Sequence, residues 1–322
     1  MDLVRNLLRK RWIIVGAGAA GLRAARRSVA AVGERRRLLR RGEIRPLRAH
    51  WSTVDGMRVY ARVSTTEAQP GTLPVVLVHG FGVSSSYFVP AAERLATEFA
   101  VYAVDLPGHG KSDTPPEALD VPRLADALVG WLDAVGIERA ALVGDSMGAQ
   151  VVVDAAERYC ERVDRLVLIG PALDPAAGKL TELARRFVAD GLYERKSLAR
   201  LVAIDFARMR TRLRAELRFL LRYRIEEKLP HVSAPALVVR GEKDTVAPQA
   251  WCDHVAAQIG AEPVVVIPEW GHAVHYSAPR EFVEAVAPFL RQCALSHKRP
   301  HDESGARART SYVEPSRPRR LA

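Results

Sequence analysis

The sequence predicts an α/β fold with a mostly parallel central β-sheet that is flanked by helices. Short, continuously apolar runs rich in valine, isoleucine and leucine alternate with segments of helical spacing. Strands that are apolar along their whole length are typical of parallel sheets covered on both faces. The 322 residues, 48% of them hydrophobic, suffice for one large core, so no repeat or second domain is needed.

Seven segments have the β-branched content and flanking turns of strands, and five have helical spacing. The expected strands are residues 58–63, 74–79, 100–106, 140–144, 163–170, 235–240 and 263–267. The expected helices are residues 90–98, 121–135, 147–158, 249–259 and 280–292. Sheets of this kind carry their sites at the carboxyl ends of the strands, where we therefore expect the functional residues.

One long segment interrupts the alternation. Residues 171–231 contain no expected strand and are prone to form helices, so we expect a helical cap over the strand ends. The cap has a net charge of +6, with arginines at Arg208, Arg210, Arg212, Arg214, Arg218, Arg222 and Arg224. A solvated helix face explains them most simply. The alternative is a lid that attracts anionic substrates or lipid headgroups.

The net charge of +11 belongs to the two ends of the chain. Residues 1–50 carry +11 and residues 291–322 carry +5, which leaves −5 for the body. We expect a basic N-terminal arm or weak membrane-associated segment over 1–45, one domain over 46–292 and a disordered basic tail over 293–322. The ends contain almost no aromatic residues to interleave with the basic ones, so no specific nucleic-acid binding is expected.

The N-terminal arm contains two misleading patterns. Gly16, Gly18 and Gly21 form a G-x-G-x-x-G string, but the acidic strand end that a dinucleotide site needs about twenty residues later is replaced by an arginine run. The eleven apolar residues 12–22 fall short of the roughly twenty that span a membrane. Their basic flanks are compatible with peripheral contact to an anionic membrane, with a weak signal segment or with a helical arm.

Cysteine usage indicates a reducing compartment. Cys160, Cys252 and Cys293 are too few and too scattered for a disulfide framework or a zinc site. We therefore expect a cytoplasmic protein, with membrane association through the arm as a further hypothesis, and no metal.

Residues 144–148 read Gly-Asp-Ser-Met-Gly, directly after an apolar run and before a helical segment. This is the context of a nucleophile elbow, a sharp strand-to-helix turn with a serine at its centre. Such a turn holds Ser146 in a strained backbone conformation, for which Gly144 and Gly148 supply the small neighbours. Taken alone, the string also fits an ordinary turn.

A serine nucleophile needs a histidine base and a carboxylate that orients it, in the chain order serine, acid, histidine. Asp244 follows the expected strand 235–240, and His272 follows 263–267. Both thus lie in loops at strand carboxyl ends. Asp244 alone could be a turn-former, with Glu242 its nearest substitute, and His275 is the second choice for the base.

An oxyanion hole needs two backbone N–H donors, one after the nucleophile and one after an early strand. Met147 supplies the first. The segment His79-Gly80-Phe81-Gly82 follows the run Val75–Val78, which makes Phe81 the expected second donor and His79 a scaffold residue. The side chains of Phe81 and Met147 stay free to line an acyl pocket.

These motifs resemble the α/β-hydrolase fold superfamily over roughly residues 50–292. The resemblance rests on His79–Gly82, on the elbow, on Asp244 and His272, and on the D-x-x-G-x-G-x-S loop that begins at Asp105. It implies a catalytic triad of Ser146, His272 and Asp244 that works without metal or cofactor.

Within that superfamily the chain is most similar to carboxylic-ester hydrolases: esterases, monoacylglycerol lipases or thioesterases acting on a small-molecule ester or thioester with an apolar acyl group. Dehalogenases and epoxide hydrolases use an aspartate nucleophile instead of Ser146. C–C bond hydrolases stay an alternative, although they usually have asparagine and tryptophan where this chain has Asp145 and Ala273. Cofactor-free haloperoxidases or perhydrolases stay open, as does a non-catalytic binding protein, against which the intact triad argues.

Overall fold

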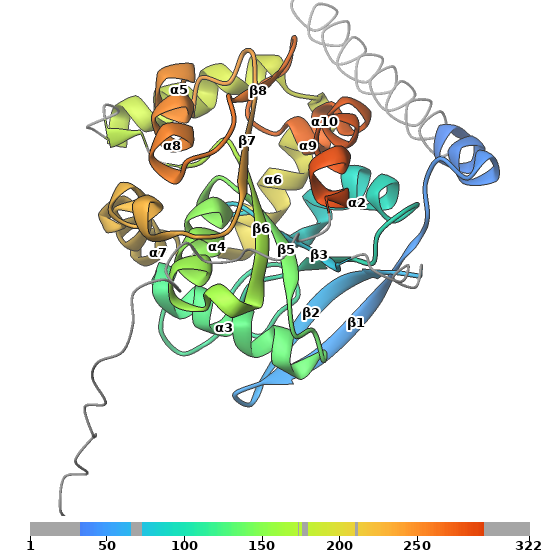
Figure 1. Cartoon of the computed structure of the whole chain (residues 1–322), viewed down its shortest axis with the longest axis horizontal. Helices are drawn as coiled ribbons and strands as arrows, with labels where there is room; N and C mark the ends of the chain where they lie inside the picture. The colour runs from blue at the N-terminus through green and yellow to red at the C-terminus, as the bar shows by residue number, and fades with distance from the viewer. Residues whose placement is uncertain (1–32, 66–72, 173, 176–179, 210–211, 293–322) are drawn as a thin grey trace, which may run out of the picture.

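The computed structural model describes residues 33–65, 73–172, 174–175, 180–209 and 212–292 (Figure 1). The G-x-G-x-x-G string of the N-terminal arm and the C-terminal tail lie outside these residues. Within the described residues, no helix combines the length and apolarity that crossing a bilayer requires.

The described residues form one eight-stranded sheet in the order β1-β2-β4-β3-β5-β6-β7-β8. The pairs β1–β2 and β2–β4 are antiparallel, and all the others are parallel. The bounds are β1 Leu47–Val54, β2 Met57–Ser64, β3 Val75–Val78, β4 Val101–Val104, β5 Ala140–Asp145, β6 Val163–Ile169, β7 Ala236–Gly241 and β8 Val265–Ile267. The predicted mostly parallel α/β fold is confirmed.

Strand β1 is the one that the sequence pattern did not predict. It lies at the edge of the sheet, and only its last residue, Val54, is buried, so it has no apolar run. The two-residue turn Asp55-Gly56, in which both residues have positive φ (49° and 77°), joins it to β2. Such turns match the twist of a hairpin. Just before β1, Ile44 is already buried at 2% exposure.

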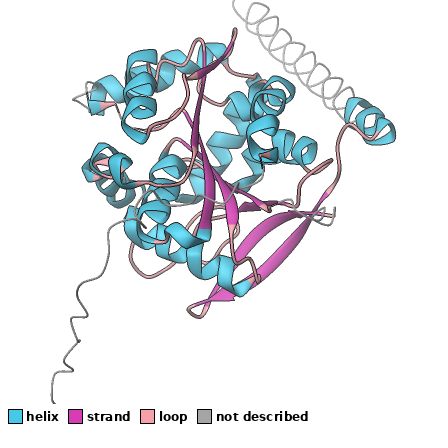
Figure 2. Cartoon of the chain, viewed as in Figure 1, coloured by secondary structure: helices cyan, strands magenta, loops and turns pink. Residues whose placement is uncertain are grey.

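Helices cover both faces of the sheet (Figure 2). One face packs against α3, α4 and α8, and the other against α2, α9 and α10. Along β5, Leu142 belongs to the first core and Ala141 and Val143 to the second, as the period of two requires. The helices are α2 Val89–Leu95, α3 Val121–Ala134, α4 Met147–Arg158, α8 Gln249–Ile259, α9 Val274–Ser277 and α10 Pro279–Arg291.

Between β6 and β7 the chain forms the predicted cap. It contains α5 Leu180–Asp190, η4 Gly191–Tyr193, α6 Lys196–Met209 and α7 Leu213–Arg222, followed by two short turns, Ile225–Glu227 and Leu229–His231. Several cap arginines bind other groups of the protein instead of facing only solvent. Arg212 donates to the carbonyl oxygens of Pro115 and Glu117 at 3.0 and 2.7 Å and pairs with the buried Glu216 at 3.4 Å. Arg210 lies outside the described residues.

Candidate active site

The turn at Ser146 has the strained geometry expected of an elbow. Ser146 links β5 to α4 with φ 53° and ψ −113°, a backbone conformation that L-residues rarely adopt. Two close approaches explain the glycines: a Cβ on Gly148 would overlap the carbonyl oxygen of Val78, and one on Gly144 would overlap that of Gly148. The N–H of Ser146 donates to Ile169 O of β6 at 2.9 Å, which ties the turn to the neighbouring strand.

Asp244 and His272 form a buried hydrogen-bonded pair. Asp244 Oδ2 lies 2.9 Å from His272 Nδ1, and the side chains are 0% and 8% exposed. The other carboxylate oxygen, Oδ1, accepts the N–H groups of Val246 and Ala247 at 2.8 Å each. Because a carboxylate only accepts, His272 carries its proton on Nδ1. Its Nε2 is buried and has no hydrogen-bond partner within the described residues, so it is available as a base.

Gly170 shows how closely this pair lies to the elbow. It follows Ile169, the residue that accepts from Ser146, and has φ 44°. A Cβ on it would lie 2.7 Å from His272 Nδ1 and 3.0 Å from Asp244 Oδ2. The carboxyl end of β6 therefore brings Ser146 and the pair together, and a side chain there would push them apart.

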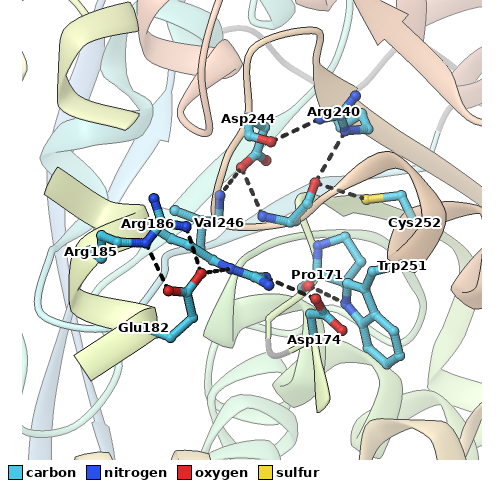
Figure 3. A network of polar contacts seen from close by, with 11 residues as sticks. Pro171, Asp174, Glu182, Arg185, Arg186, Arg240, Asp244, Val246, Trp251 and Cys252 are labelled. Carbon is cyan, nitrogen blue, oxygen red and sulfur yellow. Dashed lines mark hydrogen bonds and ion pairs between the residues drawn. The ribbon is translucent and has the colours of Figure 1, made fainter. Parts of the chain in front are cut away.

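Arg240 fixes the Asp244 loop and was missed at the sequence level (Figure 3). This arginine is 5% exposed at the end of β7. It donates to the carbonyl oxygens of Asp244 and Ala247 at 2.9 and 3.1 Å and to Gln249 Oε1 at 2.9 Å. A single arginine closing an otherwise apolar run was the available signal.

The electrostatics separate the roles of the buried ionisable groups. Burial lowers the pKa of His272, but the charge and hydrogen bond of Asp244 outweigh it, so the net shift is upward. Burial raises the pKa of Asp145 well above its usual value, and Tyr87 donates its hydroxyl to this carboxyl. Burial, then the charge of His272, lowers the pKa of His275 far below its usual value.

The alternative candidates, His275 for the base and Glu242 for the acid, do not join the Asp244–His272 pair. His275 faces Asp145, with Nδ1 3.5 Å from Oδ1, and packs on the ring of Phe88 with centroids 4.3 Å apart. Glu242 is exposed and accepts the N–H of Glu269 at 3.0 Å. The structure thus brings His272, and not His275, to Asp244.

The loop after β3 passes directly against the elbow. A Cβ on Gly80 would lie 3.2 Å from Ser146 Cβ, so the next residue, Phe81, begins beside the serine. His79 contacts Gly80 O at 2.9 Å and accepts the N–H of Leu106 at 3.0 Å. Burial, with the charge of His109, lowers the pKa of His79 to about 3, as suits a scaffold residue. Met147 is the first residue of α4, where N–H groups have no intrahelical acceptor.

Aromatic side chains of the cap lie over this region. The ring of Phe187 on α5 is 6.0 Å from that of His272, and Phe206 on α6 meets Phe81 edge-on at 5.9 Å. Phe206 also fills the space that a side chain on Gly82 would need. The sequence did not single out these two phenylalanines, because contacts between the cap and the strand-end loops join residues far apart in the chain.

No group of three or more histidine, cysteine, aspartate or glutamate side chains in the described part of the chain could hold a metal ion. The sheet order, the elbow at its centre and the pair on the neighbouring strand ends define an α/β hydrolase. The chain belongs to the alpha/beta hydrolase family, whose model matches residues 75–285.

Three comparisons illustrate the relationship. The chain is 31% identical over 246 residues to the dihydrolipoyllysine-residue acetyltransferase component of an acetoin cleaving system from Pseudomonas putida, covering 69% of this chain but only 64% of that protein, less than two thirds. It is 27% identical over 255 residues to Esterase YbfF of Escherichia coli K12, covering 73% and 99%. A malate-bound thermophilic esterase from Thermogutta terrifontis superposes with a TM-score of 0.60 at 26% identity, covering 76% and 98%.

Proposed function

We propose that this α/β hydrolase cleaves carboxylic esters through an acyl-enzyme on Ser146. The observation that carries the proposal is the buried Asp244–His272 pair beside a serine in a strained strand–helix turn. In the described part of the chain, His272 Nε2 has no hydrogen-bond partner. The esterases among the relatives support ester hydrolysis as the reaction.

In the proposed reaction Ser146 Oγ attacks the ester carbonyl while His272 Nε2 takes its proton. The carbonyl oxygen becomes an oxyanion, which accepts hydrogen bonds from the N–H groups of Phe81 and Met147. The tetrahedral intermediate collapses, its carbon–oxygen bond to the alcohol breaks, and His272 protonates the departing alkoxide. A water molecule, deprotonated by the same histidine, then attacks the acyl-enzyme and releases the acid and Ser146. Asp244 stabilises the imidazolium in both halves.

The test of the nucleophile is Ser146→Ala. A fluorophosphonate should label the parent and not this variant, and hydrolysis of p-nitrophenyl esters should fall by roughly 10³-fold or more. Ser233→Ala, at an exposed serine of the cap-to-sheet connection, is the matched control and should keep parental labelling and turnover. If Ser146→Ala labels and turns over like the parent, the acyl-enzyme proposal is wrong.

An apolar acyl group is the proposed substrate feature, with esters and thioesters both in the class. The aromatic rings of Phe81, Phe187 and Phe206 near Ser146 and His272 support it, because apolar chains gain by burial against such surfaces. Rates for p-nitrophenyl esters and acyl-CoAs of increasing chain length test it. A preference for acetyl, or for polar acyl groups, would contradict it.

We further propose that the protein is cytoplasmic and that its basic N-terminal arm contacts anionic membranes. The charge of residues 1–50 supports this. The test is co-sedimentation with vesicles that contain phosphatidylserine, for the full chain and for a variant lacking residues 1–32. Salt-sensitive binding that the deletion abolishes supports the proposal. Unchanged binding after the deletion contradicts it.

A further inference from the structure

Residues 190–195 of the cap, from the last residue of α5 to the start of α6, bind the loop that carries His272. Three consecutive backbone N–H groups of this loop donate to it. Gly271 N–H donates to Tyr193 O at 3.4 Å, His272 N–H to Asp190 Oδ1 at 2.9 Å and Ala273 N–H to Glu194 Oε1 at 2.7 Å. The backbone around the proposed base is therefore bound by the cap, whereas Asp244 binds its ring.

A second set of contacts joins the same cap segment to α9, which follows the loop. Ser277, fully buried, donates its hydroxyl to Glu194 Oε2 and accepts the N–H of Arg195 at 3.2 Å. Arg195 Nε donates to Ser277 O at 2.7 Å, and its guanidinium carbon lies 5.8 Å from the centre of the Trp270 ring. Both ends of the loop, before and after His272, thus contact the same cap segment.

The glycine before His272 fits this arrangement. A Cβ at Gly271 would lie 2.7 Å from Asp190 Oδ1 and 2.9 Å from Glu194 Oε1. These separations are closer than real Cβ contacts allow, so the absent side chain makes room for the two carboxylates.

We propose that Asp190 and Glu194 are positioning residues for the proposed reaction: by accepting the N–H groups of His272 and Ala273, they hold the imidazole in its productive orientation only when the cap is seated. The inference rests on the proposed function, since it needs His272 to be the base. In this arrangement the cap both covers the site and completes it.

The choice of side chains agrees with a role beyond anchoring. Asp190 is buried and Glu194 half-buried near the acidic Asp244, although neutral side chains could anchor a cap at lower cost. Burial, with the charges of Asp244 and Glu194, raises the pKa of Asp190 to about 7 against the opposing charge of His272. Burial likewise raises the pKa of Glu194. In their ionised forms the two carboxylates add negative charge to that of Asp244, which favours protonated His272 and so stabilises the imidazolium of the proposed reaction.

Four variants test the proposal. Asp190→Ala and Glu194→Ala remove the acceptors, whereas Asp190→Asn and Glu194→Gln keep an acceptor oxygen and remove the charge. The control is Glu182→Ala, also on α5, where the carboxylate pairs with Arg185 and Arg186 at 2.7 and 3.2 Å. Each protein is assayed for kcat and KM with one p-nitrophenyl ester and for the pH dependence of kcat/KM.

We expect the alanine variants to lose about 10- to 100-fold in kcat, with KM changed less than about threefold, since small displacements of a catalytic group have costs of this size. The amide variants should recover most of that loss. In Asp190→Asn, the acid limb of kcat/KM should also move to lower pH, because one negative charge near His272 is gone. Glu182→Ala should match the parent.

Parental kcat in both alanine variants, or a change confined to KM, would overturn the proposal. So would amide variants that are as impaired as the alanines, or an equal loss in Glu182→Ala. If an alanine variant does not fold, the amide variants and their pH profiles decide the matter. The two failures can be told apart by Ser146→Ala. If the proposed function is wrong, this variant hydrolyses esters like the parent. If only the present inference is wrong, Ser146→Ala is inactive while Asp190→Ala and Glu194→Ala keep the parental kcat.

Discussion

Replacing Asp244 by asparagine changes one atom and should inactivate the enzyme by reversing a tautomer. The N–H groups of Val246 and Ala247, each 2.8 Å from Oδ1, require an acceptor, so the amide oxygen should take that place. The NH2 group then faces His272 Nδ1, 2.9 Å from the present Oδ2. A donor there requires Nδ1 to be unprotonated, which puts the proton on Nε2, the atom that accepts the Ser146 proton in the proposed reaction.

The expected loss of kcat in Asp244→Asn follows from this misplaced proton. A wrong tautomer costs about 10⁴-fold in kcat in serine proteases, which corresponds to roughly 5.5 kcal/mol at about 1.36 kcal/mol per decade. The loss of the charge also destabilises the imidazolium of the transition state. Folding should be nearly unaffected, because the backbone contacts of the loop, including those with Arg240, are preserved.

The assay is kcat for a p-nitrophenyl ester at a pH where the parent is fully active, together with the thermal midpoint of each protein. Glu242→Gln, two residues earlier, is the matched control, because its amide oxygen can still accept the N–H of Glu269. A loss of less than about 10²-fold for Asp244→Asn, with the fold intact, would refute the reasoning. An equal loss of kcat in Glu242→Gln would indicate that the proposed role of Asp244 is not specific to it.

Three further predictions follow from the site. Because the pKa of His272 is raised, kcat/KM should increase with pH through a midpoint above the usual histidine value of about 6.5, and a pH–rate profile with a midpoint at or below that value would contradict this. Burial raises the pKa of Asp145 in the native state, so the contribution of this carboxyl to stability falls as pH rises above the pKa of about 4 that it has in the unfolded chain. Asp145→Asn removes this loss, so its advantage over the parent in urea unfolding should grow as pH rises above about 4, and a pH-independent difference would contradict this. Gly170→Ala and Gly136→Ala both force alanine to positive φ (44° and 71°), which alone should cost each about 1 kcal/mol of stability. A Cβ at 170 would lie 2.7 Å from His272 Nδ1, whereas nothing lies within 4 Å of one at 136. Activity should therefore fall by about 10²-fold in Gly170→Ala alone, and equal activities would count against the crowding argument.

The sequence predicted those features that depend on neighbouring residues. Each proposed triad member lies at or shortly after the end of an apolar run, and runs buried in a parallel sheet end at one edge. The order of the runs therefore sufficed to place Ser146, Asp244 and His272 together. Their catalytic roles, and that of the N–H groups of Phe81 and Met147, stay predictions, of which Ser146→Ala and Asp244→Asn test those of the nucleophile and the acid.

The features that were missed depend on contacts between distant segments. Strand β1 is half-exposed and stabilised by pairing with β2, so its side chains carry no apolar signal. Asp190 and Glu194 lie about eighty positions before the N–H groups that they accept, inside a segment predicted only as helical. The predicted helix 90–98 ends earlier, at Leu95, because residues 96–99 turn back toward β4 with N–H groups bonded to α2.

The position of β5 in the sheet also has a consequence for folding. Its partner β3 comes from well before it in the chain, with Val75 beside Ala141. Its other neighbour, β6, follows it after α4 but pairs across the whole cap with β7, where Leu166 lies beside Ala236. Loop closure of this length has to be completed before such pairings become favourable, so the centre of the sheet forms late. Hydrolytic activity would then be absent from partly folded chains and would appear only with the finished molecule, which makes it a stringent reporter of complete folding.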